Sequence, residues 1–436
     1  MSAESTATSQ PTVTAAPEPP VQEKPLFRNR DFQAMWISQF FAAFGKEAAE
    51  IAYPLLILAT TGSATYAGAV GAVQLVVAGV MSLPGGSLTD RFNRKLIMIV
   101  CDLARLVLLA LFAVLVMSDA VNVWFTFAIV ILSATCLGVS NPAGMAAIKQ
   151  LVPASQLTQA TAQNQIRFFG ATVAGPPAGG ALFALARALP FFAAALSFLV
   201  SAVILLLVKK PTQAPRTVET KAAPKGSMLD GFKFIVKQPI ILTLVLWAMG
   251  SNMAFNHSGM FLALIATAQD RGASEALIGT TLAIAGGGGL TGALLAGIVL
   301  KYVRPPVIMA YAIWIGPVAA VLLTFVPGTL PLGIIVACIF LRAGVVGALI
   351  YGYIAALVPD NLQGRVIGAV MFVGMIAQPI GIFAVGAIFD LAGPTWVFVF
   401  MAVAGTLFAL PTLSKRIRTL PAPEELAKQT TSEDGK

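Results

Sequence analysis

Charged residues are scarce in this sequence. Asp, Glu, Lys and Arg make up only 11% of its 436 residues, whereas 57% are hydrophobic. A soluble globular protein carries roughly a quarter charged residues, because its water-facing surface requires them. Apolar runs of about 20 residues, the length that crosses a ~30 Å hydrocarbon core as a helix, recur along the chain. Segments of alternating hydrophobicity, typical of membrane β-barrels, do not. The composition therefore predicts an all-α integral membrane protein.

The residue types that build catalytic and metal sites are scarce as well. The sequence has one histidine, His257, and three cysteines, which all lie within apolar runs. A histidine pair for a metal ion and a disulfide framework are therefore excluded. Neither a phosphate-binding G-x-x-x-x-G-K-S/T loop nor an H-E-x-x-H motif is present. We expect no catalytic residue, no metal and no cofactor, which makes an intramembrane enzyme a remote alternative.

Twelve apolar segments predict twelve membrane-spanning helices. They are, within a few residues, 32–60, 64–84, 96–117, 121–142, 164–185, 189–208, 239–267, 276–300, 306–326, 330–357, 366–389 and 394–413. Two six-helix bundles, residues 27–208 and 239–413, flank a linker at 209–238 whose second part is amphipathic, which predicts a helix at the membrane interface. The remaining residues form two tails, 1–26 and 414–436, and the first has the composition of a disordered segment.

Lysine and arginine are distributed unequally between the two sets of loops. They gather before span 1, in the linker, in the C-terminal tail and in the loops after spans 2, 4, 8 and 10, whereas the opposite loops hold only Arg187 and Arg271. Loops rich in Lys and Arg stay in the cytoplasm. We therefore expect a multi-pass protein of the cytoplasmic (inner) membrane with both chain ends in the cytoplasm. The same distribution accounts for the net charge of +9 without a nucleic-acid partner.

The two halves of the chain share short stretches of sequence. Leu151-Val-Pro153 after span 4 recurs as Leu357-Val-Pro359 after span 10, and Gly180-Ala-Leu-Phe183 at the end of span 5 recurs as Gly386-Ala-Ile-Phe389 at the end of span 11. Both matches have the same offset and equivalent places in the topology. Duplicated six-span halves predict two bundles around a central cavity, which move against each other during transport.

The loop between spans 2 and 3 carries a family signature. Its sequence, Gly86-Ser-Leu-Thr-Asp-Arg-Phe-Asn-Arg-Lys95, resembles the G-x-L-a-D-r-x-G-r-R/K motif of the major facilitator superfamily. Asn93 replaces the usual glycine, and because asparagine tolerates left-handed backbone angles, we expect the turn to be kept. The resemblance implies a gate between the two bundles on the cytoplasmic side. The gating residues would be Gly86, Asp90, Arg91, Arg94 and Lys95.

Span 5 carries a second motif of this superfamily. The run from Gly175 to Gly180 (G-P-P-A-G-G) is similar to the G-P-x-x-G-G motif of its antiporters, and the segments around Asn141-Pro142 and Leu151-Val-Pro153 are similar to macrolide and siderophore exporters. We expect this helix to pack closely on its counterpart, span 11, through small residues and a proline kink. The motif residues are Gly175, Pro176, Gly179 and Gly180. Span 4 has none of the basic residues that many proton antiporters of the family carry there.

Span 1 contains three charged residues near its middle, Lys46, Glu47 and Glu50. An ionisable group in a spanning helix is costly, so each one indicates function by default. All three share one helix face, and the surplus carboxylate should take up a proton more readily than it would in water. The cluster predicts proton coupling or substrate contact. The alternative is an intrahelical ion pair near the outer mouth.

Other spans hold isolated polar residues. In span 3, Asp102 and Arg105 are spaced to form an intramembrane charge pair, which is either structural or part of a gate. In span 10, Arg342 has no acidic partner on its own helix, so it either pairs with another helix or faces the cavity, where it would favour an anionic group. In span 7, a polar stripe is a candidate cavity lining, although a hydrogen-bonded packing role is the favoured interpretation for His257. The stripe consists of Asn252, Asn256 and His257.

These features together predict a secondary transporter. By resemblance to the exporter branch, it would export an amphipathic small molecule such as a drug, macrolide or siderophore in exchange for protons, by alternating access. A proton-coupled importer of a small solute is the nearest alternative. A passive channel is disfavoured, because the polar residues are clustered rather than arranged in rings along a pore. We expect the protein to function as a monomer. Its partners would be the small-molecule cargo, protons and the surrounding lipid bilayer.

Overall fold

The fold is all-α, as predicted. A computed structural model describes residues 25–213 and 228–414, and within these ranges it contains helices and no strand. The predicted tails lie almost entirely outside the described residues, as do linker residues 214–227. The helices of the first half are α1 (Arg30–Thr61), α2 (Ala64–Arg91), α3 (Arg94–Met117), α4 (Val123–Leu151), α5 (Leu157–Leu185) and α6 (Leu189–Leu206).

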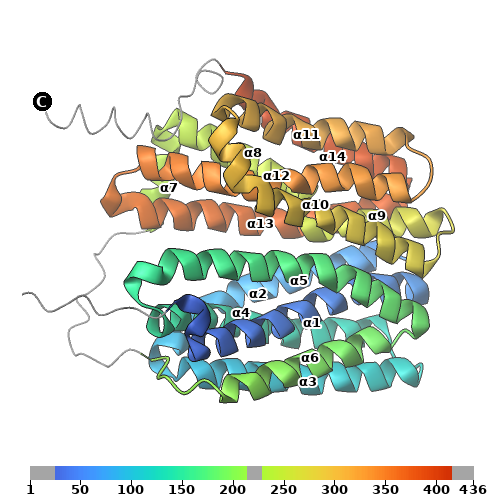
Figure 1. Ribbon diagram of the computed structural model, residues 1–436. Helices are drawn as coiled ribbons and strands as arrows, with labels where there is room; N and C mark the ends of the chain where they lie inside the picture. Colours follow the sequence, from blue (N-terminus) through green and yellow to red (C-terminus); the bar gives the residue numbers. More distant parts are fainter. Residues whose placement is uncertain (1–24, 214–227, 415–436) are drawn as a thin grey trace, which may run out of the picture.

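The second half begins with a short helix of the linker, α7 (Met228–Lys237), which packs on α13 through the backbone of Gly231 and the buried side chain of Ile235. Longer helices follow. They are α8 (Pro239–Phe255), α9 (His257–Asp270), α10 (Glu275–Tyr302), α11 (Pro305–Phe325), α12 (Leu330–Leu357), α13 (Asp360–Ala392) and α14 (Pro394–Ala409). Figure 1 shows α1 to α6 in one layer and α7 to α14 in the other.

Each predicted span coincides with a helix, with one exception. Span 7 is divided at Asn256, whose backbone is extended (φ −65°, ψ 154°) and whose side chain accepts a hydrogen bond from the Gly259 N–H at 2.7 Å. Among the described residues, eleven helical segments are long and apolar enough to cross a membrane, with α8 and α9 counted together. The helix α1 has sufficient length but differs from these segments by the three charges at its middle.

Short polar residues begin many of these helices. At each such start, an Asn or Ser side chain accepts a hydrogen bond from an N–H of the first turn, which would otherwise lack a partner. Asn93 does so for α3, bonding the N–H groups of Lys95 and Leu96, and its φ is −63°. The expected left-handed backbone at Asn93 is therefore wrong. Asparagine fits this turn because it caps the next helix. The residues with this role are Asn29, Ser63, Asn93, Asn122, Asn256 and Ser274.

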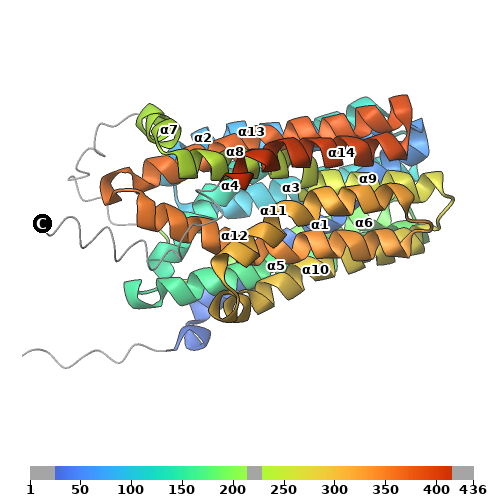
Figure 2. The ribbon, with the colours of Figure 1, turned by 90° about the horizontal axis from the view of Figure 1, so that it is seen from above.

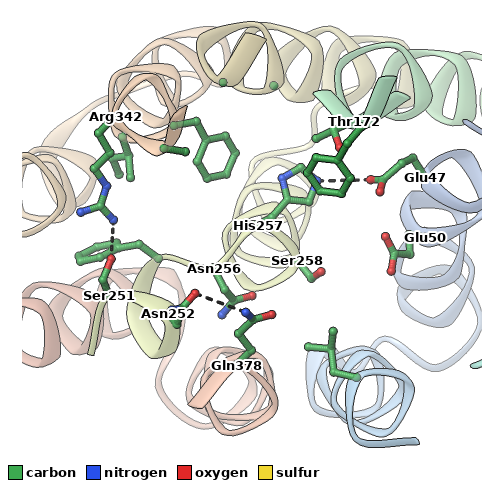
Figure 3. Close-up of a pocket in the computed structure, with 18 of the residues that line it drawn as sticks. Glu47, Glu50, Thr172, Ser251, Asn252, Asn256, His257, Ser258, Arg342 and Gln378 are labelled. Atoms are coloured by element: carbon green, nitrogen blue, oxygen red, sulfur yellow. Dashed lines mark hydrogen bonds and ion pairs between the residues drawn. The ribbon is translucent and has the colours of Figure 1, made fainter. Parts of the chain in front are cut away.

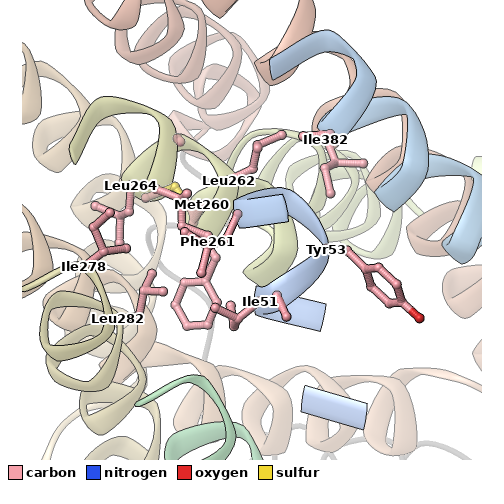
Figure 4. Packing of buried hydrophobic residues seen from close by; sticks show 14 of the residues in the cluster. Ile51, Tyr53, Met260, Phe261, Leu262, Leu264, Ile278, Leu282 and Ile382 are labelled. Atoms are coloured by element: carbon pink, nitrogen blue, oxygen red, sulfur yellow. The ribbon is translucent and has the colours of Figure 1, made fainter. Parts of the chain in front are cut away.

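The two halves are sealed together at the end of the bundle away from the chain termini. One continuous cluster of buried apolar side chains there includes Ile51 of α1, Leu262 of α9, Leu282 of α10 and Ile382 of α13, and Figure 4 shows its packing. The α2 and α13 backbones lie so close that a Cβ on Gly68 would come 2.7 Å from the carbonyl oxygen of Ile382. We call this end of the bundle the outer end.

The carboxylate of Asp390 fastens α13 of the second half to the start of α2 in the first. It accepts hydrogen bonds from the Ser63 hydroxyl (2.6 Å) and from the N–H groups of Ala64 and Thr65 (both 2.8 Å). These N–H groups belong to the first turn of α2, where the helix dipole also favours a negative charge. Asp390 therefore acts as a helix cap supplied by the opposite half.

At the end nearer the termini, the apolar clusters of the two halves are separate. One cluster, which contains Phe32, Met98 and Leu151, belongs to the first half, and two others, around Trp247 and Ile354, belong to the second. Figure 1 shows that α1 begins at this end, which is the left-hand end in Figure 2 as well. The structure is thus closed at the outer end and divided at the end that carries the termini.

Removal of the Asp390 carboxylate should loosen the outer end. We expect Asp390→Ala to cost the closed arrangement about 1–2 kcal/mol, the usual value of a helix cap, and to raise the population open at the outer end roughly 5- to 30-fold. Met117 and Phe325 are the exposed last residues of α3 and α11. In a variant without the native cysteines, spin labels at these two positions would report the opening as a longer distance between the labels.

The matched control is Asp270→Ala, since Asp270 also lies at the outer end but forms no hydrogen bond or ion pair with any described residue. An unchanged distance distribution in Asp390→Ala, or an equal change in both variants, would show that the cap does not hold the two halves together.

Candidate functional site

A cavity of about 440 Å³ lies between the two halves. Its walls come from α1, α2, α4 and α5 on one side and from α8, α9, α10, α12 and α13 on the other (Figure 3). Most of the surface is apolar, with aromatic rings from Phe168, Trp247, Phe255 and Phe340. The polar groups on the wall are Lys46, Glu47, Glu50, Gln74, Thr172, Ser251, Asn252, Asn256, His257, Ser258, Arg342 and Gln378.

The three charges of α1 form one cluster on the cavity wall. The Lys46 ammonium lies 3.0 Å from an oxygen of Glu47 and 2.7 Å from an oxygen of Glu50. The second Glu50 oxygen accepts a hydrogen bond from the Gln74 amide of α2 at 2.7 Å. Lys46 therefore compensates one carboxylate, and the cluster keeps one negative charge in excess when both are ionised. Such an excess in a bilayer requires a proton or another cation nearby.

A histidine of the opposite half supplies the nearest such group. His257 Nε2 lies 3.6 Å from the second Glu47 oxygen (Figure 3). The imidazole stacks against Phe261 and Phe340, with ring centres 4.1 and 5.5 Å away. His257 is the first residue of α9, so the break at Asn256 places it there. The contact joins α1 to α9, and thus the first half to the second.

Arg342 of α12 lies on the other side of the cavity from the carboxylates (Figure 3). Its guanidinium donates hydrogen bonds to the Ala312 carbonyl (2.6 Å) and the Ser251 hydroxyl (2.7 Å), and it lies over the rings of Trp247 and Phe255. Among the described residues, no carboxylate contacts it. The side chain is 8% exposed. It both contacts other helices and lines the cavity, where it is a buried cation free to meet an anion.

The asparagines of the polar stripe have different roles. The Asn252 amide oxygen accepts a hydrogen bond from Gln378 of α13 at 3.3 Å, which joins α8 to α13 on the cavity wall (Figure 3). Asn256 is largely engaged in capping α9, although it also contributes to the wall. Both residues therefore lie at the predicted place, and Asn256 in addition breaks the span that the sequence analysis treats as continuous.

The glycines of span 5 bring α5 against α1 and α10. Gly175 packs on Glu47 and Ala48, a Cβ on Gly179 would come 3.0 Å from the Ala48 Cα, and a Cβ on Gly180 would come 2.9 Å from the Gly279 Cα of α10. The predicted partner, span 11, is therefore wrong. Instead, α5 (span 5) packs on α10 (span 8), and α13 (span 11) packs on α2 (span 2). The two contacts correspond to each other, because spans 5 and 11, and spans 2 and 8, occupy equivalent places in the two halves. The motif thus fixes the backbone that carries the Glu47 carboxylate.

Asp102 and Arg105 do not form the predicted salt bridge. The Asp102 carboxylate accepts a hydrogen bond from Ser201 of α6 at 2.6 Å, and this hydroxyl also contacts Ser38 of α1. Arg105 lies over the ring of Phe198 and lines a cavity of about 20 Å³ beside Lys46 and Glu50. A hydroxyl from a neighbouring helix has replaced the expected partner, which spacing along α3 alone does not reveal.

The loop motif divides into two parts. Arg94 donates to the carbonyls of Ala146 and Thr212, and Lys95 donates to those of Leu206 and Val208, so both bind the turn to their own half. The side chains of Asp90 and Arg91 are exposed and form no hydrogen bond or ion pair with any residue the structure describes, and nothing lies near Gly86. Among the described residues, the motif makes no side-chain bond to the second half, which agrees with the separated clusters at this end.

Several polar residues of the cavity are not among those predicted from the sequence. Gln74, Ser251 and Gln378 are uncharged, and a search for intramembrane charges passes over them. The two glutamines were still detectable as amides within apolar runs of spans 2 and 11. Asp390 was missed because it lies at the end of its span, where a charge needs no special explanation.

Membrane-spanning helices in two halves, with a central cavity that holds polar and charged groups, define a membrane transporter. The sequence matches the family model of the Major Facilitator Superfamily over residues 35–382 and 253–434. The chain therefore belongs to this superfamily, as the resemblance in its sequence implied.

Known proteins agree with this assignment. An uncharacterised transporter of the superfamily from Bacillus subtilis, YfiS, is 25% identical over 90% of this chain and 94% of its own length. The multidrug efflux pump Tap of Mycolicibacterium fortuitum is 27% identical over 79% of this chain and 85% of its length. Among solved structures, the nucleoside transporter NupG has a TM-score of 0.70 at 11% identity, covering 87% of this chain and 98% of that one. A bacterial homologue of Spinster has a TM-score of 0.64 at 15% identity, covering 94% and 99%.

The close contact at Gly179 yields a test of the helix packing. At a helix position with free space around it, replacing glycine by alanine stabilises the protein by up to about 1 kcal/mol. At a tightly packed position, the added methyl group destabilises it by about 1–3 kcal/mol. We therefore expect Gly179→Ala to lower the unfolding temperature in detergent. Gly287→Ala is the matched control, because nothing lies within 4 Å of a Cβ there, and it should leave the unfolding temperature unchanged or higher. Equal behaviour of the two variants would contradict the packing role.

Proposed function

We propose that this protein exports an amphipathic small molecule, such as a drug, macrolide or siderophore, in exchange for protons. The observation that carries the proposal is the contact of Glu47 with both Lys46 and His257 on the wall of the central cavity. The cluster has one carboxylate more than Lys46 can neutralise, so a single proton, on a carboxyl group or on the imidazole, makes it neutral. We assign the proton to the cluster as a whole and not to one of its residues.

The same contact links the proton to the motion of the two halves. Glu47 lies on α1 and His257 on α9, and the halves must separate at the outer end when the transporter opens there. Separation takes the imidazole away from Glu47 and admits water, which changes the cost of the excess charge. Proton binding and release would therefore favour different arrangements, as coupled transport requires.

The direction of transport rests on the orientation of the chain and on its relatives. The distribution of Lys and Arg favours both chain ends in the cytoplasm of a bacterial-type cell. The cavity of the described structure then opens to the cytoplasm, where an exporter loads its cargo. Similarity to the Tap efflux pumps supports export. The largely apolar wall with a few polar groups suits an amphipathic cargo.

A vesicle experiment tests the proposal. Inside-out vesicles that carry the protein in their membrane are given an acidic interior. Lipophilic cations, macrolides or siderophore-like anions are then added one at a time. We expect proton release with at least one class. The double variant Glu47→Gln, Glu50→Gln should abolish gradient-driven transport, because the cluster loses the excess negative charge that attracts a proton to the carboxylates or to the imidazole. Exchange of labelled cargo down its own gradient should continue.

Glu275→Gln is the matched control, because Glu275 lies at the start of α10 and outside the cavity. It should transport as the unmodified protein does. Undiminished proton-driven transport by the double variant would refute coupling through this cluster. Uptake of a solute together with protons would instead favour the importer.

A further inference from the structure

A second cavity, of about 300 Å³, lies between α10, α11 and α12 of the second half. We call it the α10–α12 groove. It occupies the part of the bundle nearer the chain termini, because the turn from α10 to α11 forms one end of it. Its lining is apolar apart from the Tyr311 hydroxyl, which donates to the Cys338 carbonyl at 2.8 Å, and Arg342. The other lining residues are Gly292, Leu295, Val299, Val303, Val307, Ile308, Ala312, Leu341, Val345 and Val346.

The groove faces the outside of the bundle on one side. Leu295, Val303, Val307 and Tyr311 line it, and these side chains are between 37% and 57% exposed. They lie on spanning helices or the turn between two of them, so the surrounding lipid meets them. An apolar chain bound in the groove would therefore contact protein on one side and lipid on the other. Apart from Arg342, the polar side chain on its wall is Tyr311, whose hydroxyl is already bonded to the Cys338 carbonyl.

Arg342 lies between this groove and the central cavity. Arg342 and Val346 line both spaces. On the side of the central cavity, the guanidinium lies between Trp247 and Phe255 and donates to Ser251. A buried cation without a contacting carboxylate favours an anion next to it, since a charge-assisted hydrogen bond is stronger than a neutral one. A cationic group that lines the central cavity thus lies directly beside an apolar groove.

We propose that the cargo is a single-chain amphipath with an anionic head, and that the α10–α12 groove binds its tail. The head lies in the central cavity at Arg342, and the alkyl tail passes Arg342 and Val346 into the groove. The inference rests on the proposed function and narrows it, because a cationic amphipath would be repelled at Arg342. A bilayer phospholipid does not fit this arrangement, since its bulky head is held at the membrane interface.

Photolabelling of the purified full-length chain in nanodiscs of phosphatidylcholine tests the proposal without transport. The probe is a long-chain fatty acid with a diazirine in its chain, and the comparison probe is the alcohol of the same length. We expect the carboxylate to label residues of the groove about tenfold more than the alcohol does, as the loss of a charge-assisted hydrogen bond implies. Arg342→Gln should abolish the difference, and Arg342→Lys should retain part of it.

A pair of neighbouring variants separates the groove from the general lipid surface. Val299→Trp fills the groove and should reduce labelling about tenfold, whereas Ile298→Trp, on the adjacent exposed position outside it, should not. The tenfold reduction in labelling is the size expected when a large side chain overpacks an apolar site. Equal labelling by carboxylate and alcohol, or labelling that Val299→Trp leaves unchanged, would overturn the proposal. Proton antiport of a cation or macrolide alone would refute this cargo class and leave the proposed function intact.

Discussion

The constraint on which this structure depends is the neutralisation of charge inside the bilayer. Lys46, Glu47 and Glu50 lie on one turn of a spanning helix, and each would be costly alone. Their mutual contacts reduce the cost but leave one negative charge, and His257 of the opposite half approaches it. The break of span 7 at Asn256, the glycines of α5 and the amide of Gln74 all serve to bring these groups together. The cluster is thus a property of the assembled halves rather than of α1.

Two pairs of helices close the outer end, and the pairs are chemically unequal. Duplication makes α2 with α13 the counterpart of α10 with α5. In the first pair, the Asp390 carboxylate caps the opposite helix. In the second, glycines 180 and 279 place the backbones in contact without any charge. A polar cap can be broken and remade with water as the substitute partner, whereas a glycine contact works as a close-packed pivot. The two helix pairs at the outer end are therefore held together by different interactions.

The sequence predicted what depends on local composition. The positions of the spanning helices followed from apolar length, but several helices continue beyond the apolar runs, such as α4, which ends at Leu151 and not near residue 142. The charges of α1 followed from their rarity. The partners of side chains did not follow, because they come from other helices. Asp102 bonds Ser201 rather than Arg105, and span 5 packs on α10 rather than on α13. The break at Asn256 was missed since an average over an apolar run hides one polar residue, although asparagine before a helix turn is an ordinary cap signal.

The proposed anion site and the proton site use separate groups, so their coupling needs a physical connection. The contacts of α12 supply one. Phe340 and Arg342 lie two residues apart on this helix, and the ring of Phe340 stacks on His257, which in turn approaches Glu47. If the proposed cargo draws Arg342 towards the cavity, we expect the neighbouring Phe340, which contacts the imidazole, to move with it. Because the Glu47–His257 distance sets the cost of the unpaired carboxylate, cargo and proton would compete through this helix without sharing a single binding group.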